Sequence, residues 1–455
     1  YITGLKILQN VVKTDNSYEA NLFYAMALSQ TGSLKEAEVY FKKALEDDDE
    51  GIDAFRGLGD VKTELKDFSA AESYYKKALK IEQTNVPVLV SLAEMYLIQG
   101  KIDKGIELLT NAEVNSPSDV NILVALGNAY YERETWALAK QYFDKALKIK
   151  PNLPSAYFGI GKSYRKQKKF KEAVESFDKV ISIDSKFAEA YYEKALILNA
   201  LGNYESSSEN MVKYLELKPN SGKGKSFFGR TLYELEKYEE AISVFKDLSQ
   251  NDTTYASTAN LFLGRIYSKL KSKDSLTTVQ NSLASIDYYS KAKQDEIEYD
   301  DLLNLGNVYT NLKNISEAST YFNKAIMKDE ASPEAYFEMG KMYFGENQLE
   351  TAVDYFQKAI SKGLKTSGIY LYCGAANYNL KKFEDAARDL KESVKINENN
   401  PIGFLFLAKS LRALGNAEEA IANYQKVLVL DPTNQEAADA IKVLSTQQEP
   451  ENKEK

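Results

Sequence analysis

The sequence predicts an all-α fold, a solenoid in which about twelve helix-turn-helix repeats stack in chain order. Two observations support this prediction. Segments of similar sequence recur along the chain, and most of them lie 34 residues apart. Within each half of the repeating unit, apolar residues follow the i, i+3, i+4, i+7 spacing of an amphipathic helix. A single unit cannot bury its own apolar face, so neighbouring units must stack to form a core.

The second half of each unit carries the clearest signature, an alanine with an aromatic residue four positions later. Ala71 with Tyr75 and Ala139 with Phe143 are two examples. Twelve residues before that alanine stands a glycine or alanine, such as Gly127 before Ala139. Small residues let two helix backbones approach closely, and the aromatic ring fills the gap toward the next unit. We call the first helix of each unit the A helix and the second the B helix.

In half of the units a tyrosine stands three positions after the small A-helix residue. Proline, as at Pro117 and Pro151, often follows the B helix. This succession resembles the tetratricopeptide repeat family, whose pattern is apolar-Gly-x-x-Tyr, then Ala-x-x-x-Phe-x-x-Ala, then Pro. The resemblance covers nearly the whole chain and implies a right-handed α-solenoid superhelix of about twelve tetratricopeptide repeats. It implies little about function, because the motif specifies packing.

Taken in order, the pattern divides the chain into six parts. These are a lone helix of a truncated repeat (1–17), seven 34-residue repeats (18–256), an irregular longer repeat (257–298), four further repeats (299–434), a C-terminal capping helix (435–445) and a disordered polar tail (446–455). Because the lone helix lacks its A partner, we expect the natural chain to extend further toward the N-terminus. The extra residues near 271–285 are interpreted as a tolerated surface insertion, with a partner contact as the alternative.

Composition removes several classes of function. The chain has no histidine and a single cysteine, Cys373, which excludes histidine-dependent catalysis, intrachain disulfides and thiolate zinc sites. The net charge of −8 opposes binding to nucleic acid. No apolar run approaches the roughly 20 residues of a membrane span, so we expect no direct membrane insertion of this fragment. The composition does not distinguish between a location in the cytoplasm and one in a bacterial periplasm or cell envelope.

One segment is similar to a phosphate-binding loop. It ends in Gly161, Lys162 and Ser163, but Ala156 stands where the first glycine of such a loop belongs. The repeat pattern places Gly161 in the middle of a helix, where backbone N–H groups are not free to bind phosphate. We therefore expect no cofactor, no metal site and no enzymatic activity in this chain.

The resemblance implies that partners bind a concave groove lined by the A helices, with the second, fifth, ninth, twelfth and thirteenth positions facing it. Near the N-terminus these positions carry an acidic stretch, Asp53, Asp60 and Glu64, with Arg56 among them. In the middle of the chain they carry cations and aromatic rings. The candidate binding residues there are Asn128, Tyr131, Phe158, Lys162, Arg165, Lys166, Tyr192, Arg230, Tyr233, Arg265 and Lys269. Further residues at these positions are Phe337, Lys341, Phe344, Leu371 and Tyr378.

Cations interleaved with aromatic rings suit an extended acidic peptide, because charge attracts the peptide and aromatic faces hold it. We therefore predict a non-catalytic scaffold or adaptor that binds partner proteins or extended peptides in its concave groove. Two alternatives stay open: the substrate-recognition solenoid of an enzyme whose N-terminal catalytic domain is absent, and a bacterial envelope assembly factor. The large polar surface also permits self-association into a homo-oligomer. The sequence does not identify the partner.

Overall fold

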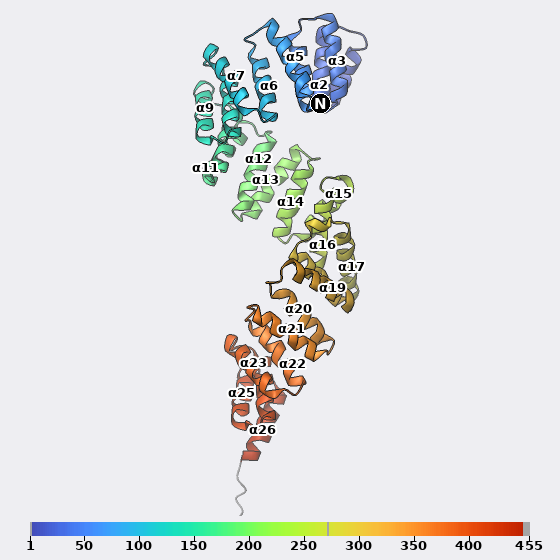
Figure 1. The fold of residues 1–455 in the computed structure, drawn as a ribbon, viewed down its shortest axis with the longest axis vertical. Helices are drawn as coiled ribbons and strands as arrows, with labels where there is room; N and C mark the ends of the chain where they lie inside the picture. Colours follow the sequence, from blue (N-terminus) through green and yellow to red (C-terminus); the bar gives the residue numbers. More distant parts are fainter. Residues whose placement is uncertain (1, 271–272, 449–455) are drawn as a thin grey trace, which may run out of the picture. The chain divides into compact units, whose positions relative to one another are not determined.

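The computed structural model describes residues 2–270 and 273–448 (Figure 1). The described residues form 26 α-helices and one short 3₁₀ helix, with no β-strand among them. Successive helices pair as helix-turn-helix units, so the prediction of an all-α solenoid is confirmed. The chain divides into two compact units, unit 1 (1–224) and unit 2 (225–455), which are described separately.

Unit 1 consists of a first helix followed by six A–B pairs. Its helices are α1 (Ile2–Val11), α2 (Tyr18–Gln30), α3 (Leu34–Asp47), α4 (Ile52–Glu64), α5 (Phe68–Ile81), α6 (Val86–Ile98), α7 (Ile102–Asn115), α8 (Val120–Glu132), α9 (Trp136–Ile149), α10 (Pro154–Lys166), α11 (Phe170–Ile183), α12 (Ala188–Ala200) and α13 (Tyr204–Leu217). The next helix, α14 (Gly222–Glu234), contains the boundary between the two units.

Unit 2 continues the alternation of A and B helices to the end of the described chain. Its helices are α15 (Tyr238–Asn251), α16 (Ala256–Lys269), α17 (Ser275–Lys291), η1 (Gln294–Glu296), α18 (Tyr299–Asn311), α19 (Ile315–Lys328), α20 (Glu334–Gly345), α21 (Leu349–Ser361), α22 (Ser367–Asn379), α23 (Phe383–Ile396), α24 (Pro401–Ala413), α25 (Ala417–Leu430) and α26 (Gln435–Gln448).

In most repeats the small A-helix residue lies directly against a large ring of the B helix, as the glycines show. A Cβ atom added at Gly127 in α8 would lie 2.5 Å from Cε1 of Phe143 in α9. At Gly59 in α4 it would lie 2.4 Å from Cε1 of Tyr75 in α5. Phe143 and Tyr75 are almost completely buried. Glycine at these positions therefore lets the paired helices approach each other across a filled seam.

The turn between an A helix and its B helix needs one residue with positive φ. Gly32 and Gly100 take this place with φ of 80° and 79°. In other repeats a residue with a side chain takes it, as at Lys66 and Lys168 with φ of 61° and 58°. The left-handed conformation ends the A helix and reverses the chain direction, as in a helix C-cap.

Consecutive A helices also pack against one another. In unit 1, α4 contacts α6, α6 contacts α8 and α8 contacts α10, and in unit 2 the A helices from α16 to α24 form a similar series. Among the described residues, contacts of this extent join consecutive A helices and not consecutive B helices. The A helices therefore lie closer together than the B helices. We call the side of each unit that they line its inner face.

The irregular repeat lengthens its B helix and its following connection. Helix α17 has 17 residues, whereas α15 before it has 14, and η1 precedes the next A helix. Residues 271–272, within the extra length, lie outside the described residues. We keep the division into repeats proposed from the sequence.

The last helix extends further than the sequence suggested. Helix α26 reaches Gln448, whereas the polar tail was expected to begin at 446. The hydroxyl of Thr446 donates to the carbonyl oxygen of Lys442 (3.1 Å), which accompanies the additional turn. Residues 449–455, the rest of the expected disordered tail, lie outside the described residues.

Candidate binding surfaces

Four consecutive A helices of unit 1 present the same position of the repeat on the inner face. This ninth position is Asp60 in α4, Glu94 in α6, Asn128 in α8 and Lys162 in α10. The last three of these residues share a hollow of about 440 Å³. Its lining residues are Glu94, Leu97, Ile98, Asn128, Glu132 and Lys162. Three A helices therefore build one recess that combines charged, amide and aliphatic side chains.

Lys162 is the cation of this hollow. Its Nζ lies 4.5 Å from the ring centre of Tyr131 and 5.4 Å from that of Phe158. In the part of the chain that the structure describes, no carboxylate oxygen lies within ion-pair distance of Nζ. Burial lowers the pKa of Lys162, although the more distant charges of Glu132 and Glu193 oppose this shift. The ammonium is therefore desolvated without a close counter-ion, and a bound anion would relieve that cost.

Arg165 already has a neighbouring carboxylate. Its Nε lies 2.9 Å from Oε2 of Glu193 in α12, with 31% of the arginine side chain and 16% of the glutamate side chain exposed. Neither atom makes a hydrogen bond of good geometry, so the pair is held by charge and not by an aligned N–H. The charge of Arg165 is thus partly balanced within the protein. Lys166, one residue further, is exposed at the end of α10.

The aromatic candidates of unit 1 are partly engaged in packing. Tyr131 is only 9% exposed. The ring of Phe158 lies 5.6 Å from that of Phe177 and 5.0 Å from that of Phe187, measured between centroids. These rings therefore act mainly as a support beneath Lys162.

Tyr192, in α12, lies beside a second cation. Its ring centroid is 5.0 Å from that of Tyr214, and Nζ of Lys223 lies 4.6 Å from the Tyr192 centroid. The sequence analysis did not name Lys223, although it occupies a second position, which is one of those expected to face the groove.

In unit 2, Arg230 and Lys269 are exposed cations above aromatic rings. The guanidinium carbon of Arg230 lies 5.8 Å from the ring centre of Phe262, and Nζ of Lys269 lies 4.6 Å from that of Tyr233. The two rings meet edge to face with centroids 5.4 Å apart. Neither cation has an ion-pair partner among the described residues. Arg230, Tyr233 and Lys269 thus keep the combination of charge and aromatic surface expected from the sequence.

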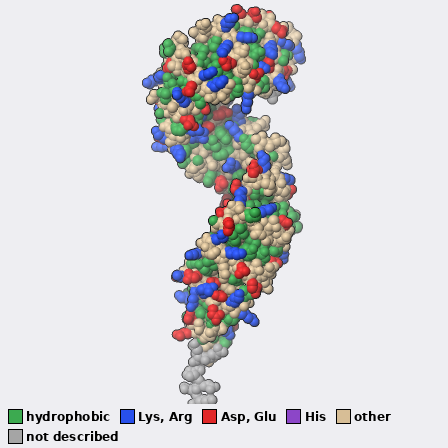
Figure 2. Space-filling model, viewed as in Figure 1, with side chains coloured by type: hydrophobic (Ala, Val, Ile, Leu, Met, Phe, Trp, Pro, Cys, Tyr) green, Lys and Arg blue, Asp and Glu red, His purple; other side chains and the backbone are tan. Residues whose placement is uncertain are grey.

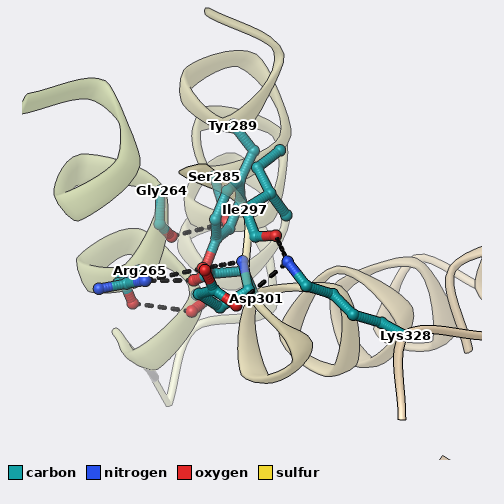
Figure 3. A network of polar contacts seen from close by, with 9 residues as sticks. Gly264, Arg265, Ser285, Tyr289, Ile297, Asp301 and Lys328 are labelled. Carbon is teal, nitrogen blue, oxygen red and sulfur yellow. Dashed lines mark hydrogen bonds and ion pairs between the residues drawn. The ribbon is translucent and has the colours of Figure 1, made fainter. Parts of the chain in front are cut away.

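Arg265 differs from the other candidate cations, because it has an internal partner (Figure 3). Its Nε and Nη2 donate to Oδ1 and Oδ2 of Asp301, each at 2.7 Å. The Asp301 side chain is 1% exposed, and it also accepts hydrogen bonds from the Tyr289 hydroxyl (3.1 Å) and the Glu298 backbone N–H (3.0 Å). The hydrogen bonds with Asp301 raise the pKa of Arg265. This pair joins α16 to α18 and leaves little charge for a ligand.

The acidic stretch near the N-terminus includes one residue that the sequence analysis did not name. Oδ1 of Asp60 accepts a hydrogen bond from the Tyr75 hydroxyl (2.7 Å), and Glu94 follows at the equivalent place on α6. Burial raises the pKa of both carboxyl groups, and the charge of Asp60 adds to the shift at Glu94. The 34-residue spacing of the two residues is the sequence signal that identifies Glu94.

The described residues contain no cluster of three or more side chains arranged to hold a metal ion. Gly161 and Lys162 lie inside α10, away from the free N–H groups of its first turn. None of the helices in the described ranges combines the length and apolarity that crossing a bilayer requires.

Comparison with known proteins identifies the repeat. A model described as tetratricopeptide repeat protein 21 N-terminal ARM repeat matches residues 5–208. Two tetratricopeptide repeat models match residues 302–330 and 333–361, and residues 376–435. The chain belongs to the tetratricopeptide repeat family. Proteins of this family generally act as protein-interaction scaffolds and generally are not enzymes.

Individual relatives cover this tetratricopeptide repeat protein unevenly. Heat shock protein STI1 of Saccharomyces cerevisiae is 42% identical over 71 residues, which are 15% of this chain and 12% of that relative. A chain in the crystal structure of the APC/C hetero-tetramer Cut9–Hcn1 is 14% identical, with 98% of this chain and 99% of that chain covered and a TM-score of 0.41. PilF of Pseudomonas aeruginosa is 22% identical over 46% of this chain and 96% of that chain, with a TM-score of 0.36.

Proposed function

We propose that this tetratricopeptide repeat protein is a non-catalytic scaffold or adaptor whose inner faces bind an extended, acid-containing segment of a partner protein. One observation carries the proposal: Lys162 lies in a hollow above two aromatic rings without a close counter-ion. A carboxylate bound there gains a charge-assisted hydrogen bond in a partly desolvated place.

The neighbours of Lys162 suit the rest of an extended peptide. Asn128 lies in the same hollow, and its amide can both donate to and accept from a peptide backbone. Ile98 is 63% exposed beside it and offers an aliphatic surface. Lys166 supplies a second positive charge at the end of α10. Arg165 contributes less charge, because Glu193 partly balances it.

Unit 2 offers a second surface of the same chemistry. Arg230 and Lys269 provide unpaired charge, and Tyr233 provides the aromatic face between them. We leave Arg265 out of this surface because Asp301 engages it. Two such surfaces on one chain allow two partners, or two segments of one partner, to bind together. The alternatives of an enzyme-associated solenoid or an envelope assembly factor would use the same surfaces on a substrate or an envelope protein.

The test is peptide binding by charge-reversed variants. The probe is a fluorescent ten-residue peptide of glutamates and leucines, and the measurement is fluorescence anisotropy at fixed ionic strength. Arg230→Glu/Lys269→Glu keeps only the surface of unit 1, and Lys162→Glu/Lys166→Glu keeps only that of unit 2. We expect the quadruple variant Lys162→Glu/Lys166→Glu/Arg230→Glu/Lys269→Glu to bind the probe at least tenfold more weakly than either double variant. The matched control is Lys171→Glu/Lys179→Glu, which makes the same charge change at exposed positions of the B helix α11. An equal loss in the control would mean unspecific attraction and would contradict the proposal.

A further inference from the structure

The ninth position of the A helix changes charge in a regular order along unit 1. Asp60 and Glu94 are acidic, Asn128 is neutral and Lys162 is basic. Because α4, α6, α8 and α10 contact one another in turn, the four side chains follow each other across the inner face. On the face of the molecule seen in Figure 2, charges of both signs are interspersed. The row of ninth positions in unit 1 therefore has an acidic end and a basic end, with Glu132 also lining the hollow beside Lys162.

The acidic end carries more negative than positive charge. Asp60 accepts a hydrogen bond from the neutral Tyr75 hydroxyl, and the charge of Arg56 acts on it without an ion pair. The nearest cation on α4, Arg56, already pairs with Asp53 through Nη2 and Oδ1 (3.0 Å). Asp60 and Glu94 have no ion-pair partner within the described ranges. Burial raises the pKa of both carboxyl groups, and the charge of Arg56 opposes this shift at Asp60.

The hollow connects the two ends, because Glu94 and Lys162 both line it. Leu97 and Ile98 line it on α6, and Asn128 lines it on α8. Its volume of about 440 Å³ is sufficient for one or two aliphatic side chains. A ligand crossing from the acidic end to Lys162 would therefore place an apolar residue here.

We propose that unit 1 binds an extended peptide segment with separated charges: a lysine or arginine on Asp60 and Glu94, an apolar side chain in the hollow, and an acidic residue on Lys162. This inference rests on the proposed function and adds the direction in which the peptide lies across the A helices. A uniformly acidic peptide would bring negative charge against Asp60 and Glu94, which like-charge repulsion disfavours.

The spacing of the charges on the ligand follows from the geometry of the stack. Neighbouring packed helices lie roughly 8–10 Å apart, and an extended chain advances about 3.3 Å per residue. Glu94 and Lys162 are two A helices apart, so the opposite charges of the ligand should be about five or six residues apart. Reaching Asp60 as well requires about eight or nine residues.

The test compares two fluorescent nine-residue peptides. The segregated probe has two lysines at one end, leucine in the middle and two glutamates at the other end, with glycine and serine between them. The acidic probe has glutamates in place of the lysines. Both probes are measured with the Arg230→Glu/Lys269→Glu variant, which removes the surface of unit 2. We expect this variant to bind the segregated probe at least tenfold more tightly by fluorescence anisotropy. Asp60→Asn/Glu94→Gln should bring the two affinities within about twofold, which corresponds to a difference of about 0.4 kcal/mol.

These substitutions keep the fold-related contacts, because an asparagine oxygen at position 60 can still accept from Tyr75. The matched control is Asp49→Asn/Glu107→Gln, which removes two exposed negative charges outside the inner face and should keep the tenfold preference. A benzophenone attached at the lysine end of the segregated probe should crosslink to α4 or α6.

The outcomes separate this inference from the proposed function. Equal affinity of the Arg230→Glu/Lys269→Glu variant for both probes, an undiminished preference when Asp60→Asn/Glu94→Gln is added to it, or a crosslink to α10 would overturn the inference alone. Failure of the Arg230→Glu/Lys269→Glu variant to bind either probe would overturn both.

Discussion

Lys162 in unit 1 and Arg265 in unit 2 occupy the same position of their repeats and have opposite surroundings. Lys162 lies over two aromatic rings, with no carboxylate of the described chain at ion-pair distance. Arg265 donates two hydrogen bonds of 2.7 Å to the buried carboxylate of Asp301. Burial lowers the pKa of Lys162, whereas the hydrogen bonds to Asp301 raise that of Arg265. One cation is therefore available to a ligand, and the other stabilises the stack.

The difference originates in the A helix that follows each cation. Its third position is Asp301 in α18, after Arg265, and Ala190 in α12, after Lys162. In the other repeats this position is alanine, glycine, valine or isoleucine, so Asp301 is the exception. For Arg265, a single residue on the next repeat thus provides the neutralising charge. The position of a residue within the repeat does not define its role by itself.

The largest expected effect is the loss of the internal pair. Arg265→Met leaves Asp301 buried and charged without its partner, which typically costs about 3–5 kcal/mol. Urea denaturation followed by circular dichroism measures this loss as a lower unfolding free energy. In the double variant Arg265→Met/Asp301→Asn the buried charge is gone, so most of the stability should return. A loss below about 1 kcal/mol in the single variant would show that the pair is not structural.

The second largest effect is expected from a substitution that introduces an equivalent carboxylate into unit 1. Ala190→Asp places a carboxylate at the position equivalent to Asp301, where it can neutralise the cations of α10. We expect the affinity of the segregated probe for unit 1 to fall at least tenfold, measured by fluorescence anisotropy. Burial of the new polar group should also cost about 1–3 kcal/mol of stability.

Ala190→Asn is the matched control, because it has nearly the same size without the charge. It should lose similar stability while changing the affinity of the probe less than about threefold, or roughly 0.7 kcal/mol. An equal loss of affinity in both variants would mean that Ala190 affects binding through packing alone.

Much of this comparison could be predicted from the sequence. The spacing of alanine, glycine and aromatic residues gave the helix pairs, because that pattern reflects which side chains meet across the seam. The unusual aspartate at 301 could have indicated that Arg265 is paired. The sequence could not predict that Lys162 has no ion-pair partner, because Glu132 and Glu193 are both near it. Only their distances decide that neither forms an ion pair with it.

The smallest expected effect concerns the pH dependence of stability at the acidic end of unit 1. Burial raises the pKa of Asp60 and Glu94 in the folded protein above their ordinary values. The folded state therefore holds these protons at a pH where the unfolded state has released them, which stabilises it at low pH. This contribution is fully present below the ordinary carboxyl pKa of about 4 and is lost as the pH rises through the raised values.

Asp60→Asn/Glu94→Gln removes this loss, so we expect a variant that gains stability relative to the wild type as the pH rises from about 4 to about 7. Thermal denaturation across that range, with Asp49→Asn/Glu107→Gln as the control, measures the change. A constant difference between variant and wild type at every pH would contradict the prediction. A gain in stability together with the loss of preference for the segregated probe would show that the acidic end reduces stability and provides binding. At the opposite end of the inner face, the buried charge of Lys162 likewise costs stability and is available to a ligand. The charge of Arg265 is neutralised by Asp301 and is not available.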